Sequence, residues 1–407
     1  MSSLGAVLVA LPVLVGLHAY IFYPLTLYVG ARIAGTRKRL RRAPSELPLP
    51  TVSVVIPAYN EEAQIRGSIE SLLAQDYPAD RLQILVLSDA STDRTDEIVR
   101  EFAPRGVELF RMPMRSGKTA AENASCSVLR GEIVVNSDSS IRLHPSAVRS
   151  LVTRMQDRLV GVASGRDVSI AHQSGANVTE AGYVGYEMWV RCLETQLGGI
   201  VGASGSGYAI RADLHRLPVR SDLSRDFSAA LTARNHGFQA VSVDDALFFV
   251  PRTSSIRREY KRKVRTISRG VETLISQHQL LDPIQHGLFA WKLISHKVCR
   301  WLFPVLAIPG TIGLALLSPD HWWARMGLGG IAIAGLLALV GLYWPSVKPA
   351  PYVISVAAFG MAANVAVIHA LWRVAFGHQD HIWEPTRREP ASSPGHHLGA
   401  NNASASP

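Results

Sequence analysis

Cysteine is scarce in this chain. Three cysteines, Cys126, Cys192 and Cys299, are spread over 407 residues, and no two have the spacing of zinc ligands or of a CxxC redox motif. This distribution excludes a cysteine-built metal centre. We interpret the three side chains as buried thiols of a protein in a reducing compartment.

Charged residues are also few, at 18% of the chain, whereas hydrophobic residues reach 47%. This mixture is typical of a globular domain joined to lipid-facing helices. The net charge of +10 is compatible with nucleic acid, an anionic membrane surface or phosphorylated ligands. Much of the excess lies beside apolar segments, which favours a lipid bilayer and no nucleic acid, although a solvated basic linker explains any single charge equally well. One such cluster is Arg37, Lys38, Arg39, Arg41 and Arg42.

The N-terminal segment lacks the basic n-region of a signal peptide, and its apolar run is too long for one. Leu4 to Val29 is apolar apart from His18 and a few hydroxyl groups, and it exceeds the roughly 20 residues that a bilayer crossing needs. We expect a transmembrane helix over residues 1–31 and a basic, proline-containing linker over 32–50. The positive-inside rule then predicts a multi-pass protein of the cell (inner) membrane, with its N-terminus outside and the next domain in the cytoplasm.

Beyond the linker, short β-branched runs alternate with segments of helical period. Such alternation predicts an α/β domain with a mostly parallel sheet covered by helices on both faces. We expect this cytoplasmic domain to occupy residues 51–280. The predicted strands are 52–56, 82–87, 107–111 and 132–136, and the predicted helices are 61–75, 92–102 and 118–129.

Apolar character returns after the α/β domain. Residues 281–300 mix apolar side chains with Lys292 and Lys297, which predicts an interfacial amphipathic helix, and residues 301–376 contain two or three spans. Three full spans would place the C-terminal arginines outside, so either one segment is re-entrant or the positive-inside rule fails here. A WEPTRR segment follows at 377–389, and the composition of 390–407 predicts a disordered tail.

Four polar clusters lie where the predicted strands end, which is the edge of an open parallel sheet where binding sites form. Each cluster alone is compatible with ordinary helix caps and turns. Four of them at successive strand ends favour a binding site. The clusters are PAYNEE (57–62), SDASTD (88–93), RSGK (115–118) with Glu122 and Asn123, and NSDSS (136–140).

The order and spacing of these clusters resemble the family-2 glycosyltransferases, whose catalytic domain has the GT-A fold, a Rossmann-like mixed sheet. The resemblance covers about residues 51–270. The flanking membrane segments resemble the membrane-bound polysaccharide-synthesising branch, which includes cellulose and hyaluronan synthases. The runs that carry the resemblance are VSVVIPAYNEE, LSDASTDRT, GKTAAENA, NSDSS, SGSGYAIRADL, SRDFSAAL, KRKVRTISRG and HIWEPTRRE.

The resemblance implies a site for a nucleotide sugar. Asp89 corresponds to the aspartate that binds the uracil or ribose, and Lys118 is a point charge suited to the base edge or a phosphate. Asp138 corresponds to the first aspartate of the DxD motif, which holds Mg²⁺ or Mn²⁺ against the diphosphate. Ser140 replaces the second, so another acid or water is expected to complete the metal shell. The implied donor-binding residues are Ala58, Tyr59, Glu61, Asp89, Lys118 and Asp138, and the implied metal ligands are Asp138 and Ser140.

The family's catalytic base is the aspartate of an (E/D)D motif. Asp226 stands at that place, and Arg225 replaces the first acid. An inverting transfer needs such a carboxylate to take the proton from the acceptor hydroxyl. The alternative role of Asp226 is an N-cap of the helix that follows it. We expect Gly205, Ser206 and Gly207 to line the acceptor site, because small residues let a sugar ring approach the backbone.

The basic stretch from Arg257 to Arg269 stands in place of the family's QxxRW motif, which clamps the diphosphate and acceptor in processive synthases. Arg262 and Arg265 can grip phosphate. The tryptophan is missing, and with it a stacking platform for a sugar ring. The alternative is a basic face on the anionic leaflet. In the WEPTRR segment, Trp383 and Arg387 are expected to form a gate over the site.

The sequence therefore predicts an inverting, metal-assisted hexosyltransferase that transfers sugar from a nucleotide sugar, such as a UDP-sugar, to a growing polysaccharide or exopolysaccharide. One alternative is a single addition to a lipid-linked (polyprenyl-phosphate) acceptor, which the missing tryptophan favours. Another is a non-enzymatic membrane protein that senses nucleotide sugar. The sugar, the linkage and the choice between a lone chain, a homo-oligomer and a complex with a secretion partner stay open.

Overall fold

The computed structural model describes residues 2–35, 48–170, 175–251, 256–344 and 350–377. The strands are β1 (Val52–Ala58), β2 (Leu82–Ser88), β3 (Val107–Arg111), β4 (Ile133–Ser137), β5 (Arg142–Leu143), β6 (Val160–Ile170), β7 (Gly207–Arg211) and β8 (Gln239–Pro251). The helices are α1 (Ser2–Leu17), α2 (Tyr23–Gly35), α3 (Ile65–Leu73), α4 (Thr95–Glu101), α5 (Lys118–Ala124), α6 (Ala147–Met155), α7 (Gly175–Gln196), α8 (Ala212–His215), α9 (Arg225–Asn235), α10 (Ile256–Ser276), α11 (Pro283–His286), α12 (Leu288–Leu293), α13 (Cys299–Leu317), α14 (Trp322–Leu342) and α15 (Tyr352–Ala375).

The α/β domain is built on an eight-stranded sheet with the order β3-β2-β1-β4-β7-β6-β8-β5. The strands β1 to β4 run parallel, as the sequence predicted. The strand β7 is antiparallel to both of its neighbours, β4 and β6, and β6 runs parallel to β8. The sheet is therefore mixed, which confirms the GT-A fold that the resemblance implied.

Alternate residues of the central strands face two separate apolar layers. Val54 and Ile56 of β1 pack in one layer with α3, α4 and α6, whereas Val55 packs in the other with α5 and α9. This period of two explains why every residue of β1 is buried, since both faces of the strand are covered. The predicted strands and helices of residues 52–137 all exist, with ends that differ by up to five residues.

Two predicted helices begin late, because the residues before them make turns. The backbone N–H of Gln64 donates to the Glu61 carbonyl, so the chain turns once before α3. Before α4, the Asp93 carboxylate accepts hydrogen bonds from the backbone N–H and the hydroxyl of Thr95. These polar residues therefore include true helix-start residues as well as site residues.

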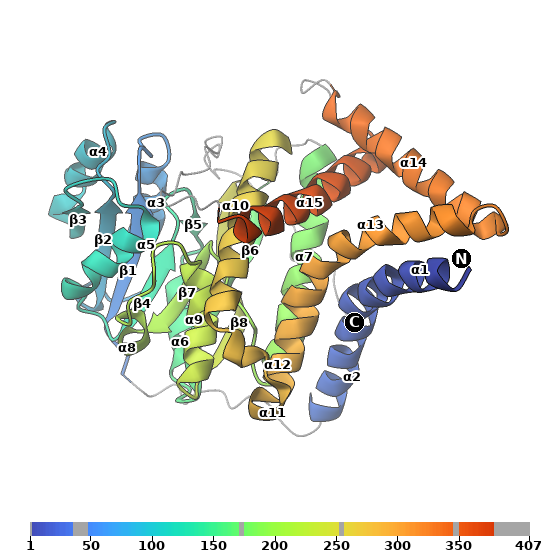
Figure 1. Ribbon diagram of the computed structural model, residues 1–407. Coiled ribbons are helices and arrows are strands. Elements are labelled where there is room, and N and C mark those ends of the chain that lie inside the picture. The colour runs from blue at the N-terminus through green and yellow to red at the C-terminus, as the bar shows by residue number, and fades with distance from the viewer. Residues whose placement is uncertain (1, 36–47, 171–174, 252–255, 345–349, 378–407) are drawn as a thin grey trace, which may run out of the picture.

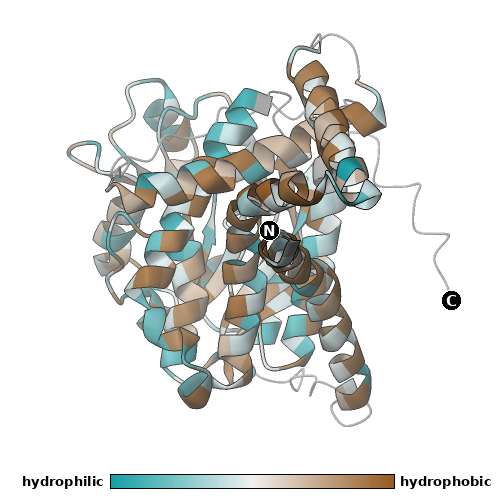
Figure 2. Cartoon of the chain, turned by 45° about the vertical axis from the view of Figure 1, so that its right-hand side comes forward, coloured by the Kyte–Doolittle hydropathy of each residue, from teal (hydrophilic) through white to brown (hydrophobic). Residues whose placement is uncertain are grey.

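Four described helices are long and apolar enough to cross a membrane: Ser3–Gly35, Leu288–Leu317, Trp322–Leu342 and Tyr352–Ala375. In Figure 1 the sheet stands on one side of the molecule and α1, α2, α13 and α14 on the other, with α7, α10 and α12 between them. Figure 2 shows that the helices around the N-terminus are mostly apolar. Apolar helices thus flank the catalytic domain at both chain ends, as predicted.

The N-terminal helix packs closely on α13. A Cβ on Gly313 would lie 2.8 Å from the carbonyl oxygen of Gly5, and one on Gly310 would lie 2.6 Å from Cγ of Pro12. Both helices contain a π-helical segment, at His18–Phe22 and Ile294–Val298, and His18 Nε2 lies 2.9 Å from Ser295 Oγ where these segments meet. Small residues at the contact allow two backbones to approach in lipid.

The segment predicted to be an interfacial helix continues directly into the next span. The helix α12, the π-helical segment and α13 form one helix over Leu288–Leu317, because Pro304 and Pro309 do not end it. On the side of the catalytic domain, the buried Lys292 ammonium donates to the carbonyls of Leu197 and Gly199. The first turns of this helix are therefore bonded to the α/β domain, and the interfacial position stays a prediction.

Two helices of the α/β domain hold the remaining apolar helices. Val264 of α10 packs on Ala366 and Ala370 of α15, and the Tyr260 hydroxyl lies 2.8 Å from His369 Nδ1. Tyr23, Leu27 and Ala31 of α2 pack on Val190 and Leu193 of α7. The domain and the apolar helices therefore form one packed body.

We expect Gly207→Ala to lower the thermal unfolding midpoint of the purified protein in detergent. The ring of Phe248 lies between Gly207 and Gly165, so that a Cβ on either glycine would overlap it. Overpacking of this kind costs about 1–3 kcal/mol. Replacing Phe248 by Leu in the same chain should restore part of the loss.

Gly185→Ala in α7 is the matched control, since its Cβ would meet nothing within 4 Å. This control should keep or raise the midpoint, because alanine favours a helix over glycine. Equal midpoints for Gly207→Ala and the natural chain would contradict the described packing.

Candidate active site

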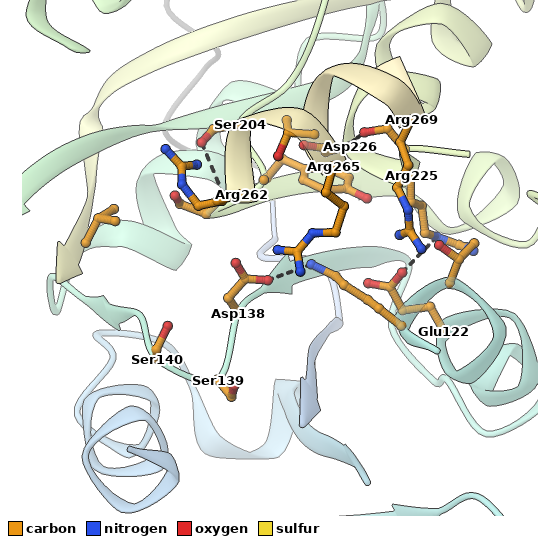
Figure 3. A pocket seen from close by; sticks show the side chains of 18 of the residues that line it. Glu122, Asp138, Ser139, Ser140, Ser204, Arg225, Asp226, Arg262, Arg265 and Arg269 are labelled. Carbon is orange, nitrogen blue, oxygen red and sulfur yellow. Dashed lines mark hydrogen bonds and ion pairs between the residues drawn. The ribbon is translucent and has the colours of Figure 1, made fainter. Parts of the chain in front are cut away.

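A polar cavity of ≈ 240 Å³ lies at the carboxyl ends of the central strands. It is enclosed by the end of β4, the start of α5, the loop before β7, the start of α9 and one face of α10, as Figure 3 shows. The strand-end clusters therefore converge, as the sequence predicted. The predicted site residues that line the cavity are Glu61, Lys118, Asp138, Ser140, Gly205, Ser206, Asp226, Arg262 and Arg265.

Lys118 and Asp138 form an ion pair at the centre of this cavity. The Lys118 Nζ lies 2.6 Å from Asp138 Oδ1, and both side chains are mostly buried. Burial alone would lower the pKa of Lys118, but the charges of Asp138 and Glu122 outweigh it and raise the pKa above its ordinary value. The lysine therefore stays protonated, as a cation beside the carboxylate from the DxD position.

Glu122 is a cavity residue that the sequence analysis placed in a strand-end cluster but to which it gave no role. Its side chain is 1% exposed, and neither carboxylate oxygen has a hydrogen-bond partner among the residues that the structure describes. Burial raises the pKa of Glu122, although Lys118 and Arg225 act in the opposite direction. The sequence signal was weak, because an acid inside a helical stretch usually lies on a solvated face.

Arg225, which replaces the first acid of the (E/D)D motif, is buried behind the cavity. Its guanidinium donates to the Asn123 side-chain oxygen and to the His215 carbonyl, and its Nε lies 3.8 Å from Glu122. Arginine at this position therefore ties the start of α9 to α5. Its positive charge also lies close enough to offset the negative charge of Glu122.

Asp226 lies in the first turn of α9 with its carboxylate in the cavity. Ser224 is the residue that stands at the N-cap, and its hydroxyl donates to Asp226 Oδ1. A Cβ on Gly205 would lie only 2.8 Å from Asp226 Oδ2, so glycine leaves room for the carboxylate. The N-cap interpretation of Asp226 is not what the geometry shows.

One face of α10 supplies most of the positive charge. Arg262, Arg265 and Arg269 point from α10 into the cavity in Figure 3, at the helical spacing of three and four residues. Arg262 donates to both carboxylate oxygens of Glu259, at 2.8 and 2.6 Å, which orients its guanidinium. The apolar face of α10 packs on α15. The basic face of α10 is therefore directed at the cavity.

Three predicted donor-binding residues lie at the same strand edge without lining the cavity. Both oxygens of the buried Asp89 accept backbone hydrogen bonds, from Ser116 at 2.7 Å and Gly117 at 2.8 Å. Arg115 of that loop stacks over the Tyr59 ring, 3.9 Å from its centroid, and Ala58 is buried at the end of β1. Asp89 thereby fixes the loop that leads to Lys118.

The predicted acceptor-lining run is divided by the structure. Gly205 and Ser206 line the cavity, whereas Gly207 is absent from the lining and lies against Phe248. Asp167 of β6 is a second acid that the predicted site lacked, and the Ser204 hydroxyl lies 2.8 Å from each of its carboxylate oxygens. Its position inside a long strand gave no sequence signal. The predicted gate residues Trp383 and Arg387 lie outside the described residues.

The cavity offers few oxygen ligands to a divalent metal ion. Among the described residues, no group of three His, Cys, Asp or Glu side chains comes together as a metal site. Asp138 and Ser140 both line the cavity, so one carboxylate and one hydroxyl are offered. This set fits Mg²⁺ or Mn²⁺ shared with a diphosphate, because Mg²⁺ keeps several waters and needs only one or two carboxylates beside substrate phosphates.

Comparisons with known proteins agree with this geometry. Residues 53–206 match the model of glycosyl transferase family 2. An N-acetylglucosaminyltransferase of Rhizobium meliloti is 24% identical over 299 residues, which cover 68% of this chain and 68% of that protein. One of Mesorhizobium japonicum is 34% identical over 157 residues, but the match spans only 36% of its length and 37% of this chain.

The fold also matches a solved structure. A mannosyltransferase of Pyrobaculum calidifontis, in complex with GDP-Man and Mn²⁺, superposes with a TM-score of 0.68 at 21% identity. The match covers 91% of this chain and 99% of that one, so it includes the apolar helices as well as the sheet.

We expect Glu122→Gln to be at least as stable as the natural chain at neutral pH. The raised pKa of Glu122 means that folding disfavours its charged form, so stability falls as pH rises from the ordinary value of 4.5 through the raised one. The Glu122→Gln variant cannot ionise and so keeps the free energy of unfolding that the natural chain loses, about 1.4 kcal/mol for each unit by which the pKa is raised. Thermal midpoints measured across this pH window should diverge in favour of the variant.

Glu70→Gln on the exposed surface of α3 is the control, and its midpoint should follow that of the natural chain. A Glu122→Gln variant that is less stable at neutral pH would show that the charged carboxylate stabilises the fold.

Proposed function

We propose that this chain transfers a sugar with inversion from a nucleotide diphosphate sugar to an acceptor hydroxyl. Residues 53–206 form a family 2 glycosyltransferase domain of the GT-A fold, and the chain is a glycosyltransferase. The observation that carries the proposal is the position of Asp226. Its carboxylate shares one cavity with the Lys118–Asp138 pair and the arginines of α10. One cavity thereby combines a proposed base, Asp226, with cations that can bind the leaving diphosphate.

The donor is held by cations in this proposal. Lys118, Arg262, Arg265 and Arg269 surround the space above the Asp138 strand end, and guanidinium groups bind phosphate oxygens in pairs. Relatives named N-acetylglucosaminyltransferases and the mannosyltransferase bound to GDP-Man both support a nucleotide sugar. We keep a UDP-hexose as the proposed donor.

The chemistry is an in-line displacement at the anomeric carbon. The acceptor oxygen forms the new C–O bond, the bond to the diphosphate breaks, and Asp226 takes the hydroxyl proton. The nucleoside diphosphate leaves with the electron pair, and its charge is met by Lys118 and the α10 arginines. A divalent ion at Asp138 and Ser140 would add Lewis-acid stabilisation of that leaving group.

We propose that the catalytic domain faces the cytoplasm of the cell (inner) membrane. The basic run that follows the first apolar helix supports this orientation, and so does the apolar flank of the domain. A growing polysaccharide was the predicted acceptor, and a lipid-linked acceptor the alternative. The structure bears on this choice through a second cavity, described below.

We expect Asp226→Asn to lower the transfer rate by about 10²–10⁴, because the amide cannot accept the proton. Donor affinity should hardly change, since Lys118 and the α10 arginines hold the nucleotide. The rate would be measured by nucleoside diphosphate release from a panel of UDP- and GDP-sugars, and the affinity by nucleotide titration.

Asp222→Asn is the matched control. It makes the same chemical change four residues earlier, at a carboxylate that pairs with Arg220 and does not line the cavity. Near-normal turnover in Asp226→Asn would remove Asp226 from the mechanism. A collapse of nucleotide affinity would assign it to the donor site instead.

We expect divalent metal and nucleotide to bind together. One carboxylate is too few to hold Mg²⁺ or Mn²⁺ tightly, so calorimetry should detect tight metal binding only when UDP or GDP is present. A chelator should abolish turnover, and Ser140→Asp should strengthen metal binding by supplying a second acid. Full turnover in excess chelator would contradict the metal assignment.

A further inference from the structure

A second cavity, of ≈ 570 Å³, lies between the α/β domain and the apolar helices. Residues of α7, α10, α13 and α15 enclose it. It meets the first cavity at four shared residues, Ser224, Asp226, Arg262 and Thr266. The proposed base Asp226 therefore lies where the two cavities join. The first cavity is the proposed donor site, and the second extends from Asp226 toward the apolar helices.

One wall of this second cavity is apolar. It is formed by a single face of α15, because the lining positions recur at the spacing of three and four residues that keeps side chains on one side of a helix. The only polar member described on this face is Asn364, whose amide donates to the Gly360 carbonyl at 2.8 Å. The other lining residues of α15 are Val356, Phe359, Gly360, Ala363 and Val367.

Cations also line the cavity, and the carboxylate of Glu187 lies among them. Arg300 pairs with Glu187 at 2.7 Å, and Lys263 lies 3.6 Å from Glu259 and 4.7 Å from the centre of the Phe359 ring. Lys297 lies over the Phe227 ring, 5.5 Å from its centroid, and makes no ion pair within the described part of the chain. A partly buried ammonium with an aromatic neighbour can receive an anion.

The polarity of the cavity changes along one helix. Lys297, Arg300, Trp301 and Pro304 line it in succession, over about 10 Å at the helical rise of 1.5 Å per residue. The first of them lies beside Phe227, the residue after Asp226. From the base outward, the walls therefore offer a carboxylate, then cations, then apolar side chains.

We propose that this cavity is the acceptor site, and that the acceptor is a membrane lipid whose phosphate lies between its hydrocarbon chain and its reacting hydroxyl. The hydrocarbon chain lies along α15, the phosphate meets Lys297 and Arg300, and the hydroxyl reaches Asp226. The hydroxyl oxygen bonds to the anomeric carbon, its proton passes to Asp226, and the nucleoside diphosphate leaves. This inference rests on the proposed function, and it names the acceptor class of the same site.

A polysaccharide acceptor fits these walls less well. A glycan carries hydroxyl groups along its whole length, and those beside the α15 face would lose their hydrogen bonds to water without gaining partners. A neutral lipid would fit the apolar wall but bring no counter-charge to the Lys297 ammonium. Only an amphiphile with an internal anion matches all three parts of the cavity.

The test uses the full chain in phosphatidylcholine vesicles with labelled nucleotide sugar. The vesicles contain phosphatidylglycerol, a polyprenyl-diphosphate monosaccharide or diacylglycerol, and a fourth arm supplies a soluble oligosaccharide. We expect label in the lipid phase with one of the two phosphate lipids, and the difference between these arms identifies the source of the phosphate. Equal or better transfer to diacylglycerol or to the oligosaccharide would overturn the inference while leaving the proposed function intact.

Two variants test the walls separately. Gly360→Leu fills the apolar part, since a Cβ there meets nothing within 4 Å, and Gly330→Leu on the exposed face of α14 is its matched control. Lys297→Ala removes the proposed phosphate contact, and Lys297→Arg restores the charge. We expect Gly360→Leu and Lys297→Ala to raise KM for the lipid about tenfold or more, with nucleotide affinity unchanged.

Gly330→Leu should stay close to the natural chain, and Lys297→Arg should recover part of the affinity that Lys297→Ala loses. Unchanged KM in Gly360→Leu and Lys297→Ala would overturn the acceptor assignment. Failure of the natural chain to bind nucleotide or to turn over any sugar with any acceptor would refute the proposed function itself, a result distinct from loss of lipid preference.

Discussion

The active-site charge depends on how α10 is held. Its arginine face covers the donor cavity because its opposite face is packed on an apolar helix, through Val264 against Ala366 and Ala370 and through the Tyr260–His369 contact. Without α15, the apolar face of α10 around Val264 would be exposed to water, and the helix would keep its contacts with α9, such as Leu274 against Phe227. The apolar helices therefore also orient the side chains of the candidate active site.

The departures from the family motif are balanced by neighbouring residues. Arg225 stands where an acid is usual, and it offsets the charge of Glu122 while anchoring α9 to α5. Ser140 stands where a second metal-binding acid is usual, and Lys118 already places one positive charge against Asp138. At both positions the charge of the altered residue is balanced by a neighbour, Glu122 for Arg225 and Lys118 for Asp138 beside Ser140.

The sequence predicted the sheet and about half of the residues that line the cavity, because both depend on local patterns. Buried runs such as Val52–Ala58 predict strands, and polar residues after them converge wherever parallel strands end together. Asp167 was missed, and Glu122 was given no role, because their neighbours Ser204 and Arg225 lie far away in the chain. Gly207 was predicted to line the acceptor site but packs against the ring of Phe248 instead. This long-range contact cannot be read from the spacing of residues in the sequence. The sequence also divided this region at residue 300, where the structure has one continuous helix over Leu288–Leu317.

The glycines at the contact of α1 with α13 make targeting and assembly separate requirements. Gly5 and Gly313 bring two backbones together, and Gly310 receives Pro12, so the two helices fit in one register. A foreign anchor of equal hydropathy would deliver the chain to the same bilayer. It would nevertheless lack the surface that α13 accepts, and the helix that carries Lys297 and Arg300 would lose its lateral support. The first helix is thus selected for shape as well as for apolar length.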